Sequence, residues 1–209
     1  MQQNREGNAT RTLAELADIS TGIQSRGYER KRTDRGEECD ARLIQARDVT
    51  TDLTLDHERL TPLRIDVKLA DRHRLQAGQV LFFGRVGQRY AVLIEENAHQ
   101  DLLADKVFFV MKVKEKSQLS PEYLAWFLNS DLPRNHFNAH ESGSVHGIIS
   151  KATLGALPVP LPDLEVQKHI GEAWACWRNK KRAVLDALNS EGELIAARLE
   201  RAAWGENNG

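Results

Sequence analysis

The stretch that decides the fold is residues 158–204, PVPLPDLEVQKHIGEAWACWRNKKRAVLDALNSEGELIAARLERAAW. Its first five residues hold three prolines, which cannot continue a helix because each lacks an N–H and restrains the residue before it to extended geometry. Asp163, a residue type favoured at helix N-caps, comes next, and no further proline follows. The sequence therefore predicts a stiff connector over 158–162, one domain over residues 1–162 and a long helix over residues 163–209.

This helix carries apolar residues spaced alternately four and three positions apart, as in a coiled coil. Seven of the ten positions are apolar, and we expect an interface at Ile170, Trp174, Trp177, Val184, Leu188 and Ile195. The polar members Lys181, Glu191 and Arg198 either set the register or weaken the pairing. A helix over 163–204 spans roughly 60 Å at 1.5 Å per residue. That is longer than the rest of the chain can cover, so the helix needs a partner; Gly192 could interrupt it.

Upstream of the connector, short apolar segments rich in β-branched and aromatic residues predict strands at 43–49, 80–83, 90–94 and 107–113. A strongly bent sheet or a small barrel is the economical way to bury them. Helical patterns cover residues 10–19, residues 121–128 behind a Ser120-Pro121 start, and the segment after Ser150. The mixed pattern of residues 52–71 predicts no element. The fold class expected is α/β, in the α+β sense.

The composition is that of an ordinary soluble protein, with 41% hydrophobic and 28% charged residues. No apolar run approaches the roughly 18 residues of a membrane helix, and residues 1–8 lack a signal-peptide core. The two cysteines lie far apart, which suits a reducing compartment, so we expect a cytoplasmic protein. The 29 basic and 30 acidic residues nearly cancel. Any anionic partner must therefore meet a local patch, such as the charged, exposed loop predicted at 24–40.

Catalytic and metal-binding patterns are weak in this sequence. His136 and His140 are four residues apart, with His146 further on, but Phe137 stands where a zinc protease helix needs its glutamate. No nucleophile elbow, adenine-methyltransferase motif or metal-nuclease motif occurs. We therefore expect a non-catalytic chain without metal or cofactor. The loop at 140–147 consists mostly of short, polar side chains and glycines, so its backbone and hydroxyl groups are suited to approach a phosphate or a base edge closely.

Several segments, taken in order, resemble the specificity (S) subunit of type I restriction–modification systems. LAELADISTG at 13–22 resembles that family's opening, LIQARDV at 43–49 and GQVLFF at 78–83 its first strands, and SPEYLAWFLNS at 120–130 its central helix. The most specific part is the succession of GSV at 143–145, ISK at 149–151, LPVPLP at 157–162 and LEVQKHI at 164–170. Together these segments cover nearly the whole chain.

The resemblance implies a target recognition domain with a curved, mostly antiparallel sheet and flanking helices, followed by a long coiled-coil-forming helix. Family members usually carry two such units, whose long helices pair antiparallel. This chain resembles a half-sized S subunit, so a second copy is the implied partner of its helix. The implied partners are double-stranded DNA, an adenine methyltransferase subunit and a restriction subunit, which supply the catalysis. A symmetric reader predicts a bipartite palindromic target.

The resemblance does not say which residues read DNA, so we select donors in the loops and at the strand-end turn around Gly84. The predicted DNA-binding residues are Gln24, Arg26, Arg30, Lys31, Arg47, Arg85, Gln88, Arg89, Ser142, Ser144, His146 and Lys151. Two alternatives differ in kind. One is an orphan regulatory protein that pairs with a full-length S subunit or a methyltransferase without reading DNA, and the other is a small enzyme with the three histidines as a metal site.

Overall fold

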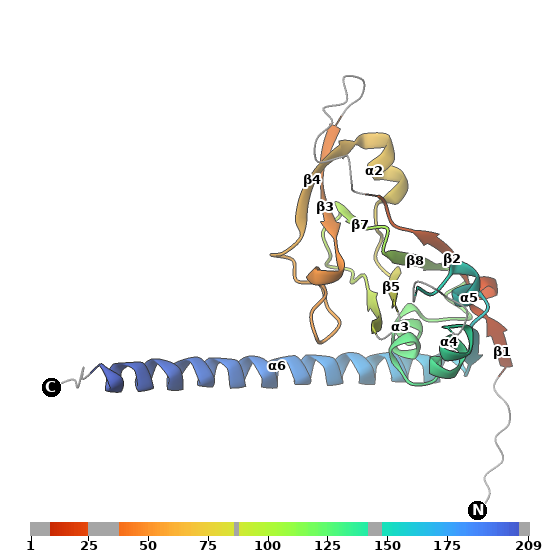
Figure 1. The fold of residues 1–209 in the computed structure, drawn as a ribbon. Helices are drawn as coiled ribbons and strands as arrows, with labels where there is room; N and C mark the ends of the chain where they lie inside the picture. The colour runs from red at the N-terminus through yellow and green to blue at the C-terminus, as the bar shows by residue number, and fades with distance from the viewer. Residues whose placement is uncertain (1–8, 25–37, 86–87, 142–147, 205–209) are drawn as a thin grey trace, which may run out of the picture. The chain divides into compact units, whose positions relative to one another are not determined.

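The structure is a computed structural model that describes residues 9–24, 38–85, 88–141 and 148–204 (Figure 1). The chain divides into two compact units, Met1–Glu172 and Ala173–Gly209. The strands are β1 (Ala9–Thr12), β2 (Ala17–Thr21), β3 (Glu38–Ile44), β4 (Thr61–Asp66), β5 (Val80–Arg85), β6 (Gln88–Leu93), β7 (Leu102–Ala104), β8 (Phe108–Val113) and β9 (Pro158–Leu161). The helices are α1 (Leu13–Leu16), the 3-10 turn η1 (Ala46–Asp48), α2 (Val67–His73), α3 (Pro121–Asn129), α4 (Arg134–Glu141), α5 (Lys151–Gly155) and α6 (Leu164–Ala203).

A four-stranded antiparallel sheet, in the order β2-β8-β5-β6, lies at the centre of the first unit. Strand β5 is buried on both faces because alternate side chains point to opposite sides of a strand. Val80 and Phe82 pack in one apolar cluster with α1, α3 and α5, whereas Leu81 and Phe83 pack in a second cluster on the other face. This double burial explains why the strand appears in the sequence as an unbroken apolar run.

The second face is covered by a three-stranded sheet, in the order β4-β3-β7. Strands β3 and β4 are antiparallel, whereas β3 and β7 are parallel. Leu102 and Ala104 of β7 join the shared cluster, and Leu103 between them joins a third cluster that includes Ala70 of α2. The layers of this unit are therefore helices, sheet, sheet and helix, with α3, α4 and α5 gathered away from α2 (Figure 1).

The mixed α/β class, the mostly antiparallel pairing and the long C-terminal helix are confirmed. The strands are distributed over three sheets. The third is a two-stranded sheet in which β9, from the proline-rich segment at 158–162, pairs antiparallel with β1. The stiff, extended segment predicted there is thus a strand, and its pairing with β1 was not predicted. Prolines are tolerated in β9 because it pairs on one side only, so its missing N–H groups break no second ladder.

Two other element predictions were wrong, and one segment left unassigned forms regular structure. The strand predicted at 43–49 ends at Ile44, where the carboxylate of Asp48 accepts the N–H of Gln45 and closes the turn η1. The helix predicted at 10–19 is limited to α1, with strands on both sides. Residues 52–71, which the mixed pattern left unassigned, include β4 and most of α2. The helix α3 begins at Pro121 behind the Ser120 cap, as predicted, and the Ser120 hydroxyl accepts the N–H of Tyr123.

Helix α6 is 40 residues long and runs through Gly192 without interruption. Its first turns belong to the first unit, where Gln167 is only 1% exposed. The Gln167 side chain donates to the carbonyls of Gln118 and Pro162, at 3.0 and 2.8 Å, and accepts the N–H of Ser120 at 2.9 Å. One turn further on, a Cβ built on Gly171 would lie 2.7 Å from Cβ of Glu122. Both residues fix the base of α6 against the start of α3.

The part of α6 that lies in the second unit leaves large apolar side chains in solvent. Trp177, Val184, Leu188 and Ile195 are each at least 50% exposed. In the described part of the chain, no helix is long and apolar enough to cross a membrane.

Candidate nucleic-acid interface

The strand register brings several predicted donors to one end of the four-stranded sheet. Thr21, the last residue of β2, pairs with Phe109 near the start of β8, and Phe108 pairs with Phe83 near the end of β5. Strands β2 and β5 therefore end, and β6 and β8 begin, at the same end of the sheet. We call this the loop end. Gln24, which is exposed, follows β2 at the loop end.

The β5–β6 hairpin closes at the loop end, with Arg85 paired to Gln88 and Gly84 paired to Arg89. Both Arg85 and Gln88 are exposed, and the guanidinium of Arg85 lies over the ring of Phe83 at 5.7 Å from its centroid. A guanidinium that stacks on a ring keeps its N–H edge available for hydrogen bonds to a phosphate or a guanine. Arg85 is therefore both oriented and accessible.

Arg85 and Gln88 are cross-strand partners and therefore share one face of the hairpin. Arg89 follows Gln88, so its side chain points to the opposite face. Its guanidinium donates to Oδ1 of Asn138 at 3.1 Å and lies 5.4 Å from the ring centroid of Phe137. It also lines a cavity of about 310 Å³ with residues of α3 and α4. These contacts hold Arg89 against α4, so its guanidinium is less available to an external partner than that of Arg85.

The segment that leads into α5 joins the hairpin at Gly84. The N–H of Ile149 donates to the carbonyl of Gly84 at 2.9 Å, and Ile148 forms a β-bridge with Arg85. A Cβ on Gly84 would lie 3.1 Å from Cβ of Ile149 and 2.8 Å from the Phe82 ring, so glycine permits the close approach of Ile149. Lys151 then begins α5 and is exposed.

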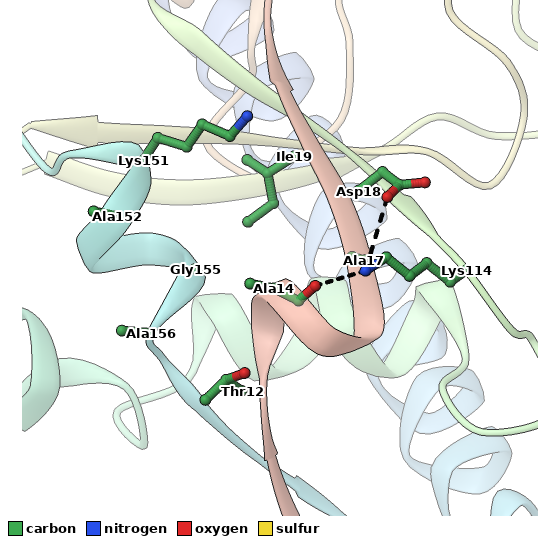
Figure 2. Close-up of a pocket in the computed structure, with 10 residues that line it drawn as sticks. All are labelled: Thr12, Ala14, Ala17, Asp18, Ile19, Lys114, Lys151, Ala152, Gly155 and Ala156. Atoms are coloured by element: carbon green, nitrogen blue, oxygen red, sulfur yellow. Dashed lines mark hydrogen bonds and ion pairs between the residues drawn. The ribbon is translucent and has the colours of Figure 1, made fainter.

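A hollow of about 800 Å³ lies beside Lys151, between α5 and the α1–β2 segment (Figure 2). Its walls are small residues such as Ala14, Ala17 and Gly155. Lys114 at its rim donates to the carbonyl of Ala14 at 2.7 Å, so that cation is held by the protein itself. The side chain of Lys151 extends along the opposite rim (Figure 2).

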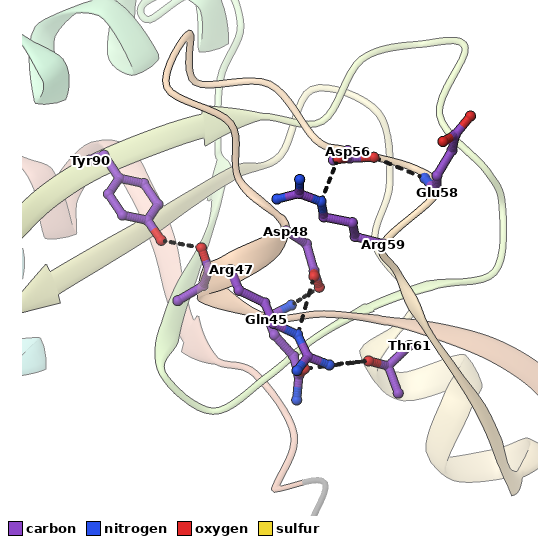
Figure 3. Close-up of polar contacts among 9 residues, drawn as sticks. Gln45, Arg47, Asp48, Asp56, Glu58, Arg59, Thr61 and Tyr90 are labelled. Atoms are coloured by element: carbon purple, nitrogen blue, oxygen red, sulfur yellow. Dashed lines mark hydrogen bonds and ion pairs between the residues drawn. The ribbon is translucent and has the colours of Figure 1, made fainter. Parts of the chain in front are cut away.

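The turn η1 places Arg47 beside the same hairpin. The hydroxyl of Tyr90 in β6 donates to the carbonyl of Ala46 at 3.2 Å and ties the turn to the sheet (Figure 3). Asp48 is 0% exposed, and its Oδ1 lies 3.7 Å from Nε of Arg47, whose side chain is 71% exposed. Burial, with a smaller contribution from the charge of Asp48, raises the pKa of Tyr90 to about 12, so the phenol remains a donor.

Arg59 is a further candidate, which the sequence pattern did not indicate. The N–H of Asp56 donates to the carbonyl of Asp48 at 2.8 Å, which brings the loop before β4 to the turn η1. Nε of Arg59 lies 2.9 Å from Oδ2 of Asp56, and the arginine side chain is 68% exposed (Figure 3). No signal in the sequence could have found it, because the segment around it has no clear periodicity and its position depends on contacts with a separate turn.

The remaining predicted donors, Arg26, Arg30, Lys31, Ser142, Ser144 and His146, lie outside the described residues. The alternative metal site is only partly visible for the same reason. Nε2 of His136 lies 2.8 Å from the carbonyl of Thr153, within hydrogen-bond distance. Within residues that the structure describes, no group of three or more His, Cys, Asp or Glu side chains could hold a metal ion.

Comparison with solved structures finds chains with a similar fold. The HsdS subunit from Thermoanaerobacter tengcongensis matches with a TM-score of 0.61 at 17% identity, covering 98% of this chain and 50% of that one. The type I S subunit from M. genitalium matches with a TM-score of 0.59 at 13% identity, over 96% of this chain and 47% of that one. A structure from a study of the assembly and conformational transition of the type I restriction–modification system matches with a TM-score of 0.62 at 15% identity, over 99% and 50%.

The chain thus has the fold of type I restriction–modification specificity subunits, as the resemblance of the sequence predicted. It spans about half the length of the solved chains that it matches. No protein-family model and no curated protein sequence matches it.

Proposed function

We propose that this chain is a DNA-recognition subunit of a type I restriction–modification complex and that it reads one short half-site. In this proposal residues 1–162 form the recognition domain, and residues 163–209 form the pairing helix. The chain acts in the cytoplasm on double-stranded DNA and is itself non-catalytic. Methylation and cleavage come from an adenine methyltransferase subunit and a restriction subunit.

The observation that carries the proposal is the gathering of donors at the loop end, on a fold that solved specificity subunits share. Arg85, Gln88 and Gln24 leave the sheet there, and Arg47 and Lys151 lie on segments that contact the same hairpin. Arginine, glutamine and lysine supply the donors that bind guanine edges, adenine edges and phosphates. A chain with nearly balanced total charge needs such a local concentration of donors to meet an anionic duplex.

Pairing of two chains through α6 completes the proposal. The exposed apolar side chains of α6 need a partner surface, and an isologous pair presents two identical recognition domains. The expected target is therefore a bipartite palindrome, in which two inverted half-sites flank an unread spacer.

The experiment is a genome-wide methylation map of cells that express this chain with a type I methyltransferase subunit, compared with cells that express the methyltransferase alone. A bipartite palindromic adenine motif that depends on the chain is the expected result. An asymmetric motif would mean that a different S chain is the partner. If no motif depends on the chain, the DNA-reading proposal fails and the orphan regulatory protein becomes the better interpretation.

The loop end is tested in the same cells with the variants Arg85→Ala and Gln88→Ala. Loss of a bidentate base contact costs roughly 1–3 kcal/mol and relaxes one position of the motif, whereas loss of a phosphate contact lowers methylation at all sites alike. Lys116→Ala is the matched control, because Lys116 is exposed and follows the opposite end of β8. Variants of Arg85 and Gln88 that behave like the control would remove the loop end as the reading surface.

A further inference from the structure

The apolar stripe of α6 contains three charged residues that a simple hydrophobic pairing does not explain. We define the α6 stripe as Trp174, Trp177, Lys181, Val184, Leu188, Glu191, Ile195 and Arg198. Its charged members occupy positions that face a partner helix, where an unpaired charge costs stability. A partner of this stripe should therefore present a negative group opposite Lys181 and a positive group opposite Glu191.

We propose that the partner is a second copy of this chain, paired antiparallel with its two-fold axis at Asp186. This inference rests on the pairing in the proposed function. The family resemblance already implies the antiparallel orientation, and the inference adds the register and the residues that select it. Lys181 and Glu191 lie equally far from Asp186 along the chain. The two-fold axis therefore places Lys181 of each copy opposite Glu191 of the other, and it forms this ion pair twice.

The same axis pairs the other members of the α6 stripe in a favourable way. Trp177 meets Ile195 of the second copy, and Val184 meets Leu188, so each of these four exposed side chains acquires an apolar partner. Arg198 meets Trp174 of the second copy, a pairing in which a guanidinium can stack on an indole ring. All three charged positions thus have a complementary partner in this one register.

Contacts within α6 agree with this arrangement. The rings of Trp174 and Trp177 are stacked, with centroids 5.2 Å apart and planes 13° apart. Nζ of Lys181 lies 5.4 Å from the centroid of the Trp177 ring. Lys181 thus lies against the apolar side chains of the stripe, and its ammonium group is carried on the same face that the second copy covers.

Two other arrangements of the copies bring like charges together. Parallel pairing in register places Lys181 opposite Lys181, Glu191 opposite Glu191 and Arg198 opposite Arg198. An antiparallel pair shifted by one heptad toward the C-terminus places Lys181 opposite Arg198 and Leu188 opposite Glu191. Like charges across a helix pair are destabilising, so the charged members of the stripe disfavour both of these arrangements relative to the register with its axis at Asp186.

The test exchanges the charges in the full-length chain and measures dimerisation by sedimentation equilibrium at low salt. Lys181→Glu and Glu191→Lys should each raise the dimer Kd at least about tenfold, because the symmetry converts two attractive pairs into two repulsive ones. The double variant, and an equimolar mixture of the two single variants, should return to within about threefold of the unsubstituted chain. Single variants that dimerise like the unsubstituted chain would overturn the register, as would a chain that stays monomeric.

Orientation is tested independently with spin labels at outward-facing positions in a Cys176→Ser background. Asp186→Cys lies at the axis, whereas Glu200→Cys is separated from its counterpart by roughly 42 Å along the helix axes at 1.5 Å per residue. The distance between labels at residue 200 should therefore exceed that at residue 186 by tens of ångströms. Equal distances at the two positions mean parallel pairing. The background without an added cysteine controls for labelling of Cys39.

The outcomes also separate this inference from the proposed function. A bipartite palindromic methylation motif together with insensitive charge variants would retain DNA recognition and reject the register. Dimerisation that follows the charge exchange without any chain-dependent motif would retain the register and reject DNA recognition.

Discussion

Gln167 offers the most direct test of how the base of α6 is held in the first unit. Its side chain makes three hydrogen bonds, to the carbonyls of Gln118 and Pro162 and from the N–H of Ser120, and it is 1% exposed. A hydrogen bond contributes about 1 kcal/mol net, so Gln167→Ala should lower the free energy of unfolding by about 3 kcal/mol. That is a large part of the 5–15 kcal/mol that stabilises an ordinary domain.

The assay is urea unfolding of the full-length chain, with hydrogen exchange at the Ser120 amide as a local readout. The Ser120 N–H loses its acceptor in Gln167→Ala, so its protection should fall more than that of β5 amides. Gln100→Ala is the control, because Gln100 is exposed and its loss should change stability by less than about 0.5 kcal/mol. A loss below about 1 kcal/mol with unchanged protection of Ser120 would refute the role of Gln167.

A same-size variant separates hydrogen bonding from the loss of volume. Gln167→Glu keeps the acceptor for Ser120 but removes the donor to two carbonyls and places a carboxylate against them. We expect it to be at least as destabilising as alanine near neutral pH. Protonation at low pH restores one donor, so the deficit should shrink as the pH falls. A deficit that is independent of pH would contradict this explanation.

Three further predictions concern α6, β6 and Tyr90. Gly192→Ala should stabilise α6 by up to about 1 kcal/mol, since a Cβ there meets nothing within 4 Å. Gly171→Ala should destabilise the chain by about 1–2 kcal/mol, because its Cβ would meet Glu122. Thermal unfolding of both variants tests whether the two changes in stability have opposite signs. Asn129→Ala should cost about 2–3 kcal/mol in urea unfolding, because the amide of Asn129 pairs with both the N–H and the carbonyl of Ala91 in the edge strand β6 and also donates to Ala125. Because the pKa of Tyr90 is raised, its contribution to stability is complete below pH 10 and is lost as the pH rises from 10 to about 12. Tyr90→Phe should therefore abolish this alkaline loss of stability. An ultraviolet titration near pH 12 that is the same in Tyr90→Phe as in the unsubstituted chain would contradict the raised pKa.

An element of the fold could be predicted from the sequence where neighbouring residues alone specify it. The spacing of apolar residues in α6 and the serine-proline start of α3 are local signals, and both helices formed where they were expected. The end of β3 could have been found from Asp48, whose carboxylate accepts a backbone N–H three residues earlier, but the apolar pattern around it favoured a longer strand. Strand β9 was hidden because its prolines are permitted only by one-sided pairing with β1.

The candidate site shows the same division. Polar and basic residues in loops were a sufficient reason to select Gln24, Arg47, Arg85 and Lys151, yet nothing in their order along the chain says that they belong together. The pairing of Thr21 with Phe109 and of Phe108 with Phe83 decides it, by placing the ends of β2 and β5 on one side of the sheet. The bond from Tyr90 to Ala46 then adds Arg47, and the bond from Ile149 to Gly84 adds Lys151.

The sequence by itself determined the helix α6, its apolar stripe and the chemistry of the donors, because helix periodicity and side-chain type are properties of neighbouring residues. Only the tertiary structure decided that the donors gather at the loop end, that Arg89 is held against α4 and that the loop with Arg59 is bonded to the turn that carries Arg47. Those arrangements depend on strand pairs and hydrogen bonds between residues far apart in the chain, which no local pattern encodes.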